Sequence, residues 1–263
     1  MPERRALEAV IFDAGGTLVR LDFEWMSELL RQRTLDVPVA RLRRGEIAGR
    51  RAYDASRGRA PAPGEPPPPL GSSGTTNAYF GGMLEAAGVP ADAIEWALGE
   101  FEKRHAQLGL WTRPLEGARE ALDGINAIGL RAAVVSNSDG RAEQHLIDTG
   151  VREGLEFVVD SHLVGIEKPD PRILALALGR LGVAPDRTLF VGDLRSVDAA
   201  VAQAAGTHFT LVDPFADYGE GLDSIRSMSE LPAHVARQFA TPRGGPQEFT
   251  PIHPARARER SAS

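Results

Sequence analysis

The chain has 263 residues, of which 42% are hydrophobic, enough for one large or two modest domains with a substantial core. It has no cysteine, which excludes disulfides, thiolate nucleophiles and thiolate-bound metals, so any metal must be held by oxygen atoms or by the six histidines. A formal net charge of -6 argues against a general nucleic-acid-binding protein. No apolar run approaches the ~18 residues of a membrane span, and the N-terminal segment reaches Asp13 too early for a secretory signal, so we expect a cytoplasmic protein without membrane association.

The first predicted element is a short buried strand at 10–12, VIF, which ends in Asp13 and breaks on Gly15 and Gly16. A buried parallel strand of this kind delivers one carboxylate to the mouth of a sheet, which makes Asp13 a candidate nucleophile. An isolated aspartate before glycines is more often a turn former. The assignment therefore depends on later stretches of the chain.

Residues 20–110 are predicted to be mainly helical. The segment DFEWMSELLRQR at 22–33 places its apolar residues on one helical face, with Asp22 as the N-cap, and helices are also expected at 79–87 and 91–107. The basic run RLRRGEIAGRR at 41–51 is interpreted as a solvated helix face; the alternative is an electropositive surface that faces an anionic substrate. Residues 57–77 are rich in proline and poor in apolar side chains, so we expect a mobile loop there.

From Pro114 onward, predicted helices at 116–128, 140–149, 171–181 and 196–205 each lead into a short apolar strand. This alternation predicts right-handed βαβ units and an α/β fold with a Rossmann-like, doubly wound parallel sheet. We assign residues 1–20 and 111–240 to this core, 21–110 to an inserted helical domain, and 241–263 to a disordered tail. The sequence leaves the oligomeric state open.

Three predicted strands end in polar residues, namely Asp13, Ser136 and Asp193. The carboxyl ends of parallel strands lie along one edge of an open sheet, where such folds bind ligands. If the strands before Asp13 and Asp193 are neighbours, their two carboxylates must share a proton or bind a cation, and Mg2+ is the simplest oxygen-bound ion. Asp198 follows at the start of the next helix and is expected to turn toward the same ion.

A phosphate site is predicted beside the metal. Ser136 and Asn137 offer a hydroxyl and a backbone N–H at a strand-to-helix turn, which suits phosphate oxygens. Lys168 is one of only two lysines, with Lys103, and lies in the proline-stiffened loop GIEKPDP. Its charge would neutralise phosphate and stabilise the Asp13 anion.

The order of motifs, hhhDxxGTL, hhhSN, KPDP and hhGDxxxxD, resembles that of the haloacid dehalogenase superfamily, in the members with a helical cap inserted after the first strand. The resemblance covers roughly residues 6–21 and 112–235. It implies a phosphohydrolase that acts on a small phosphorylated metabolite through an aspartyl-phosphate on Asp13. It also implies that Asp13, Asp193 and the Gly15 carbonyl hold Mg2+, and that Ser136 and Lys168 bind the phosphoryl group.

One position departs from the family pattern. Phosphatases of this family usually carry a second aspartate two residues after the nucleophile as the general acid and base, and this chain has Gly15 there. The missing side chain could lower the rate by about 10²–10⁴. We therefore expect rates that fall steeply as the leaving-group pKa rises, unless another residue, from the cap, donates the proton.

Two other functions remain open. The first is a binding protein that keeps the metal and phosphate site without turnover, for which Gly15 is the main support. The second is hydrolysis of another bond: a phosphonatase needs a cap lysine, which only Lys103 offers, and a dehalogenase does not need the metal ligands Asp193 and Asp198.

Overall fold

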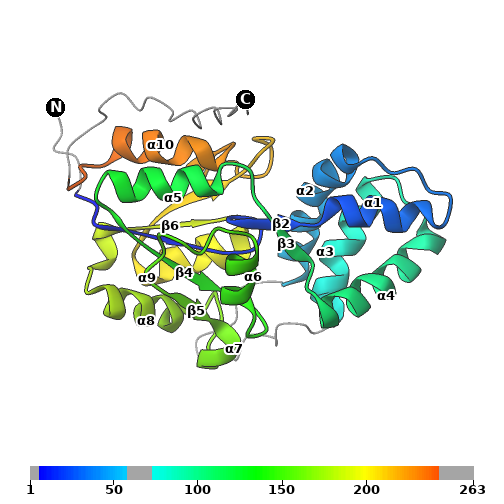
Figure 1. The fold of residues 1–263 in the computed structure, drawn as a ribbon, viewed down its shortest axis with the longest axis horizontal. Coiled ribbons are helices and arrows are strands. Elements are labelled where there is room, and N and C mark those ends of the chain that lie inside the picture. Colours follow the sequence, from blue (N-terminus) through cyan, green and yellow to red (C-terminus); the bar gives the residue numbers. More distant parts are fainter. Residues whose placement is uncertain (1–5, 58–72, 243–263) are drawn as a thin grey trace, which may run out of the picture.

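The computed structural model describes residues 6–57 and 73–242. Its larger part is a six-stranded sheet between helices, and a group of helices lies to one side of it (Figure 1). The strands of the sheet are β1 (Ala9–Phe12), β4 (Arg131–Ser136), β5 (Val158–Asp160), β6 (Thr188–Gly192), β7 (His208–Val212) and β8 (Ser224–Ile225). The α/β, Rossmann-like fold predicted from the sequence is confirmed.

The sheet has the order β5-β4-β1-β6-β7-β8, and all of its pairs are parallel. The first strand, β1, is central, with β4 on one side and β6 on the other. The strands that precede Asp13 and Asp193 are therefore neighbours, as the metal-site hypothesis requires. All four residues of β1 are buried because helices cover both faces, which explains its continuous apolar sequence.

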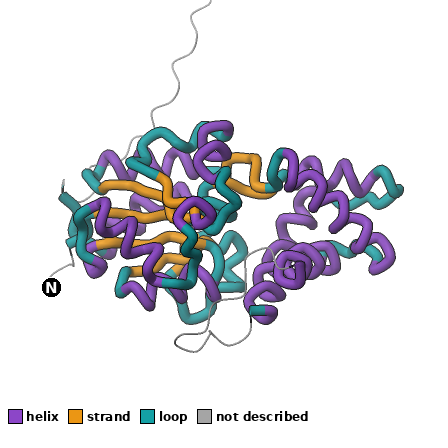
Figure 2. The backbone as a smooth tube through the Cα atoms, turned by 90° about the horizontal axis from the view of Figure 1, so that it is seen from below, coloured by secondary structure: helices purple, strands orange, loops and turns teal. Residues whose placement is uncertain are grey.

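Alternate residues of the strands point to the two faces of the sheet. Val10 and Phe12 pack on one face with α5 (Ala118–Ala127) and α10 (Leu231–Gln238). Ala9 and Ile11 pack on the other with α8 (Pro171–Leu181) and α9 (Ala200–Ala205). Shorter helices complete the core: α6 (Ala142–Asp148), α7 (Ser161–Val164), the one-turn η1 (Pro185–Arg187) and η3 (Met228–Glu230), and the π-helical turn η2 (Arg195–Ala199). Figure 2 shows these strands enclosed by helices.

The helical unit comprises α1 (Phe23–Arg31), α2 (Val39–Ser56), α3 (Ser73–Ala86) and α4 (Ala91–Gln107). It has its own apolar core, which includes Phe23, Met26 and Phe101. Asp22 caps α1 as predicted, since its carboxylate accepts a hydrogen bond from the Trp25 N–H at 3.1 Å. The helix α3 begins at Ser73, inside the segment predicted as a loop at 57–77; the remainder of that loop, 58–72, lies outside the described residues.

Two short strands join the helical unit to the core. They are β2 (Val19–Leu21) and β3 (Trp111–Pro114), which pair antiparallel in a separate sheet. The sequence analysis did not predict them, because VRL and WTRP are too short and too polar to show strand periodicity. By pairing, they bring the start and the end of the helical unit together beside the first strand of the core.

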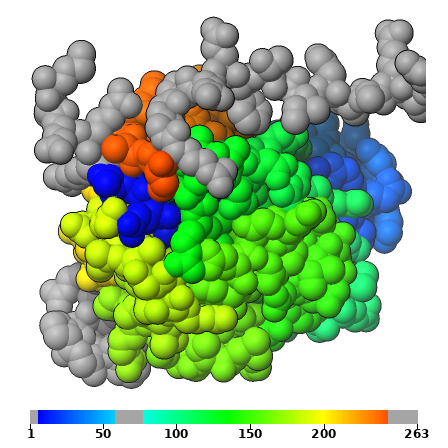
Figure 3. Space-filling model, turned by 60° about the vertical axis from the view of Figure 1, so that its left-hand side comes forward, coloured from blue at the N-terminus to red at the C-terminus, as the bar shows by residue number. Residues whose placement is uncertain are grey.

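The two ends of the described chain meet at the far side of the core, where the first residues lie against the last helix (Figure 3). Leu7 donates its N–H to the Ala240 carbonyl at 2.8 Å. Most of the predicted tail, from residue 243 onward, lies outside the described residues. Within residues 6–57 and 73–242, none of the helices combines the length and hydropathy that a membrane span requires.

Candidate active site

Asp13 follows the central strand and is only 7% exposed. Its Oδ1 accepts a hydrogen bond from Lys168 Nζ at 2.5 Å. Burial raises the pKa of Asp13 to about 6, although the Lys168 ammonium acts in the opposite direction. The Lys168 ammonium thus favours the charged form of Asp13, and a carboxylate is the form that a nucleophile needs.

Three carboxylates converge at this edge of the sheet. One ligand atom from each of Asp13, Asp193 and Asp198 lies within 4.8 Å of the others, and all three residues are buried. Burial raises the pKa of Asp193 well above its usual value, and the Asp198 and Asp13 charges add to that effect, while Arg50 opposes it. Buried oxygen ligands at this spacing suit a hard divalent cation, which would offset their mutual repulsion.

Backbone contacts hold two of these carboxylates in place. Asp198 lies in the turn η2, and its Oδ2 accepts the N–H groups of Asp193 and Leu194 at 3.0 and 2.9 Å. Asp193 packs against Gly16, where an added Cβ would lie 2.1 Å from Asp193 Oδ2. Gly16 has a φ of 78°, so both its backbone conformation and its contact with Asp193 require glycine.

Lys168 is 1% exposed and lies between the carboxylates of Asp13 and Asp198. Its ammonium group donates to Asp198 Oδ1 at 2.7 Å in addition to Asp13. Burial alone would lower the pKa of Lys168, but the two carboxylates raise it above the usual value. The residue therefore remains a fixed positive charge beside Asp13.

Ser136 and Asn137 lie at the end of β4, next to β1, the strand that precedes Asp13. Ser136 is 4% exposed. The Asn137 amide is engaged by the backbone of Lys168: it accepts the Lys168 N–H at 2.8 Å and donates to the Lys168 carbonyl at 2.9 Å. Asn137 thus positions Lys168, and substrate binding by Ser136 and Asn137 stays a prediction.

At Gly15 the space of the absent side chain adjoins Trp111 of β3. An added Cβ would lie 3.2 Å from Trp111 Cδ1, which is a tight contact. Gly15 does not have a positive φ, so its backbone would accept another residue. Gly15 has no side chain that could act as an acid, and the Trp111 indole fills part of the space that such a side chain would occupy.

The sequence analysis missed Arg50, which is carried by α2 of the helical unit. The run 41–51 was interpreted as a solvated face, but Arg50 is 2% exposed. Arg50 Nε lies 3.3 Å from Asp193 Oδ2, and Nη1 donates to the Val212 carbonyl at 2.9 Å. The solvated-face interpretation is therefore wrong for this residue. A cation that the helical unit supplies contacts a candidate metal ligand of the core.

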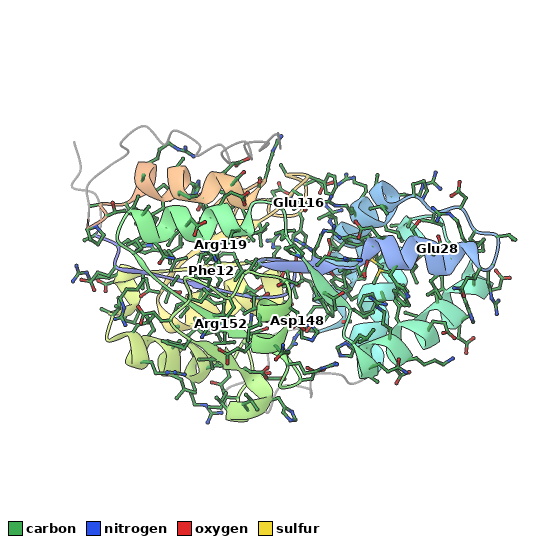
Figure 4. The ribbon with its side chains drawn as sticks, in the orientation of Figure 1. Phe12, Glu28, Glu116, Arg119, Asp148 and Arg152 are labelled. Carbon is green, nitrogen blue, oxygen red and sulfur yellow. The ribbon has the colours of Figure 1, made fainter. Side chains whose placement is uncertain are left out.

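Further polar contacts join α2 to the core. Arg43 pairs with Glu116 at 2.9 Å, and Figure 4 places Glu116 where the core faces the helical unit. Arg44 pairs with Asp217. Asp54 accepts a hydrogen bond from the Tyr218 hydroxyl. The basic helix α2 therefore binds the helical unit to the core.

Known proteins that are similar to this chain include hydrolases of one family. The family model of haloacid dehalogenase-like hydrolases matches residues 7–206. The chain is 33% identical, over 81% of its length and 84% of the relative, to "haloacid dehalogenase-like hydrolase domain-containing protein 3" of Bos taurus. It is 32% identical, over 78% and 81%, to the N-acetylmuramic acid 6-phosphate phosphatase of Pseudomonas aeruginosa. The mouse relative is 42% identical, but that match spans only 50% of its length and 48% of this chain.

Among solved structures, a hydrolase of the same family from Deinococcus radiodurans with bound phosphate and sodium is similar. Its TM-score is 0.56 at 25% identity, with coverage of 88% of this chain and 96% of that one. The family match over most of the core, together with these relatives, shows that the chain belongs to the haloacid dehalogenase-like hydrolases.

Proposed function

We propose that the protein is a Mg2+-dependent phosphohydrolase that acts on a small phosphorylated metabolite through an aspartyl-phosphate on Asp13. The observation that carries this proposal is the buried cluster of Asp13, Asp193, Asp198 and Lys168. Relatives named phosphoglycolate phosphatase and phosphoserine phosphatase support a small phosphate ester as substrate. Such a substrate agrees with the expected cytoplasmic location.

The chemistry follows from the residues at the sheet edge. Asp13, Asp193 and Asp198 would hold the ion, with the Gly15 carbonyl as the further ligand that the family resemblance implies. When bound, Mg2+ supplies positive charge to the phosphoryl oxygens. The Asp13 carboxylate attacks phosphorus, the bond from phosphorus to the leaving oxygen breaks, and Lys168 offsets the charge of the transferred group.

A screen of phosphate esters, with and without Mg2+, tests this function. Turnover should require Mg2+, and Asp13→Asn should abolish it, because an amide is a poor nucleophile. Circular dichroism of Asp13→Asn should show a folded protein. Full activity in the folded variant would refute a mechanism that uses Asp13.

The alternative is a protein that binds phosphate and a cation without turnover, and the missing side chain at Gly15 is the observation that favours it. That alternative predicts tight binding of Mg2+ and inorganic phosphate in calorimetry, with no hydrolysis of any ester. The same screen separates it from a phosphatase.

A further inference from the structure

A cavity of about 330 Å³ lies between α2 and the core. Gly16, next to the metal cluster, lines it from the core, and Leu115, Pro214 and Phe215 supply apolar wall. Its volume is at the lower end of the range of small-molecule sites, about 300–1,000 Å³. Glu46 of α2 is the one carboxylate among the described residues that line it. The cavity adjoins the metal cluster through Gly16 and Arg50, which both contact Asp193.

Defined contacts hold the Glu46 side chain, which is buried with the residue only 8% exposed. The Tyr79 hydroxyl donates to Glu46 Oε1 at 2.7 Å. Arg50 Nη2 lies 3.6 Å from Glu46 Oε2, while Nε of the same guanidinium lies 3.3 Å from Asp193. Glu46 is therefore separated from the metal cluster by one guanidinium group.

Among the residues that the structure describes near the cavity, the other groups are poor proton donors. The arginines and Lys168 remain charged, and the Trp111 indole beside Gly15 does not ionise in the ordinary pH range. The Tyr79 hydroxyl already donates to Glu46. Glu116 lies outside the cavity lining, 56% exposed, in ion pairs with Arg43 and Arg20. A carboxyl group within the cavity can both give and accept a proton, which a general acid and base must do.

We propose that Glu46 is the catalytic acid and base that replaces the side chain absent at Gly15; this role rests on the phosphatase function proposed above. Protonated Glu46 gives its proton to the leaving oxygen as the bond from phosphorus to that oxygen breaks and Asp13 Oδ bonds to phosphorus. The products are the free alcohol, the aspartyl-phosphate and the Glu46 carboxylate. That carboxylate then takes a proton from the water that attacks phosphorus. The bond between Asp13 and phosphorus breaks, which releases phosphate and restores both side chains.

Glu46→Gln tests the role, because glutamine can still accept the Tyr79 hydrogen bond but cannot transfer the proton. In the native protein kcat/KM should fall only gently as the leaving-group pKa rises. In Glu46→Gln, kcat/KM for alkyl phosphates should fall by about 10²–10⁴, while that for p-nitrophenyl phosphate changes little. Hydrolysis of the aspartyl-phosphate should also slow, so rapid mixing should show a burst of p-nitrophenol that is stoichiometric with the protein.

Asp54→Asn is the matched control. Asp54 is on the same helix and also binds a tyrosine hydroxyl, that of Tyr218, but it does not line the cavity. It should leave the dependence on leaving-group pKa unchanged and produce no burst. This control separates loss of proton transfer from loosened docking of the helical unit.

Three outcomes would overturn the role of Glu46. An equal loss of kcat/KM for all esters in Glu46→Gln, without a burst, would reduce Glu46 to a structural residue. A native dependence that is already steep would mean that no residue donates the proton. If the native protein hydrolyses no ester, the phosphatase proposal fails and the role of Glu46 fails with it, whereas a failure confined to Glu46→Gln leaves the phosphatase proposal standing.

Discussion

Asp193 contacts Gly16 on one side and the Arg50 guanidinium on the other, so its carboxylate has a fixed position before any cation binds. Asp193→Asn removes one negative charge from the three-carboxylate cluster. The loss of one charged ligand should weaken Mg2+ binding tenfold or more, and a tenfold loss of affinity corresponds to about 1.4 kcal/mol of binding free energy. Isothermal titration with Mg2+ measures this directly. Equal affinity in the folded variant would show that the cation binds elsewhere.

Gly15 provides a rescue experiment at the same scale. In a Glu46→Gln protein, Gly15→Asp should supply a new proton donor and restore hydrolysis of alkyl phosphates. The added Cβ would crowd Trp111, so a loss of about 1 kcal/mol of stability is expected as the ring shifts. Rates across graded esters and the unfolding temperature check the two effects. A stable double variant without rescue would indicate that an acid at position 15 cannot reach the leaving oxygen.

Single residues differ in how far sequence reasoning can locate them. Asp13, Asp193 and Lys168 were found because each follows a short apolar strand or lies in a proline-stiffened loop, and the parallel sheet brings them together. Arg50 was not found, since five arginines share the run 41–51 and local pattern does not tell which one is buried. Only the docking of α2 on the core makes that distinction.

At the scale of elements, the Asp223 side chain connects α10 to the edge of the sheet. Its carboxylate accepts hydrogen bonds from Thr210 of β7 and Gln238 of α10, and it pairs with His234 of α10 at 2.8 Å. Burial acts to raise the pKa of Asp223, but these partners lower it below the usual value. The folded state therefore favours the charged form.

The lowered pKa of Asp223 determines how its contribution to the stability of the fold changes with pH. A lowered pKa stabilises the fold fully above the unfolded-state pKa of about 4, and the contribution is lost as the pH falls through the folded-state value. Asp223→Asn should cost on the order of 1 kcal/mol at pH 6, because the carboxylate is partly exposed. Urea unfolding at several pH values should show the difference shrinking below about pH 4. A difference that persists at pH 2 would attribute the effect to packing.

Helices and strands could be predicted from the sequence where burial requires a regular pattern of apolar residues. The alternation of helices with apolar strands gave the core, because a strand buried on both faces must be apolar. The strands β2 and β3 and the helix α10 were not predicted. In β2 and β3 the antiparallel pairing joins segments about ninety residues apart, and their local sequence carries no record of that contact.

At the scale of the whole molecule, the helical unit and the core are held together by contacts of unequal strength. The pairs Arg43–Glu116 and Arg44–Asp217 are on the surface, where water and salt screen them and their contribution is small. Arg50 is buried against Asp193 and Glu46, which are buried as well. Removal of one partner from a buried ion pair costs about 3–5 kcal/mol, because the remaining charge is left without compensation.

Without divalent cation, Arg50→Met should therefore separate the helical unit from the core, since opening lets water solvate the Asp193 carboxylate that has lost its buried partner. Small-angle scattering should show a larger radius of gyration for Arg50→Met than for the native protein, whereas Arg44→Met, which removes a surface pair on the same helix, should match the native value. High salt should leave the native dimensions nearly unchanged, because the buried contact is poorly screened. If Arg44→Met or salt opens the molecule as far as Arg50→Met does, the surface pairs, and not Arg50, control the docking of α2.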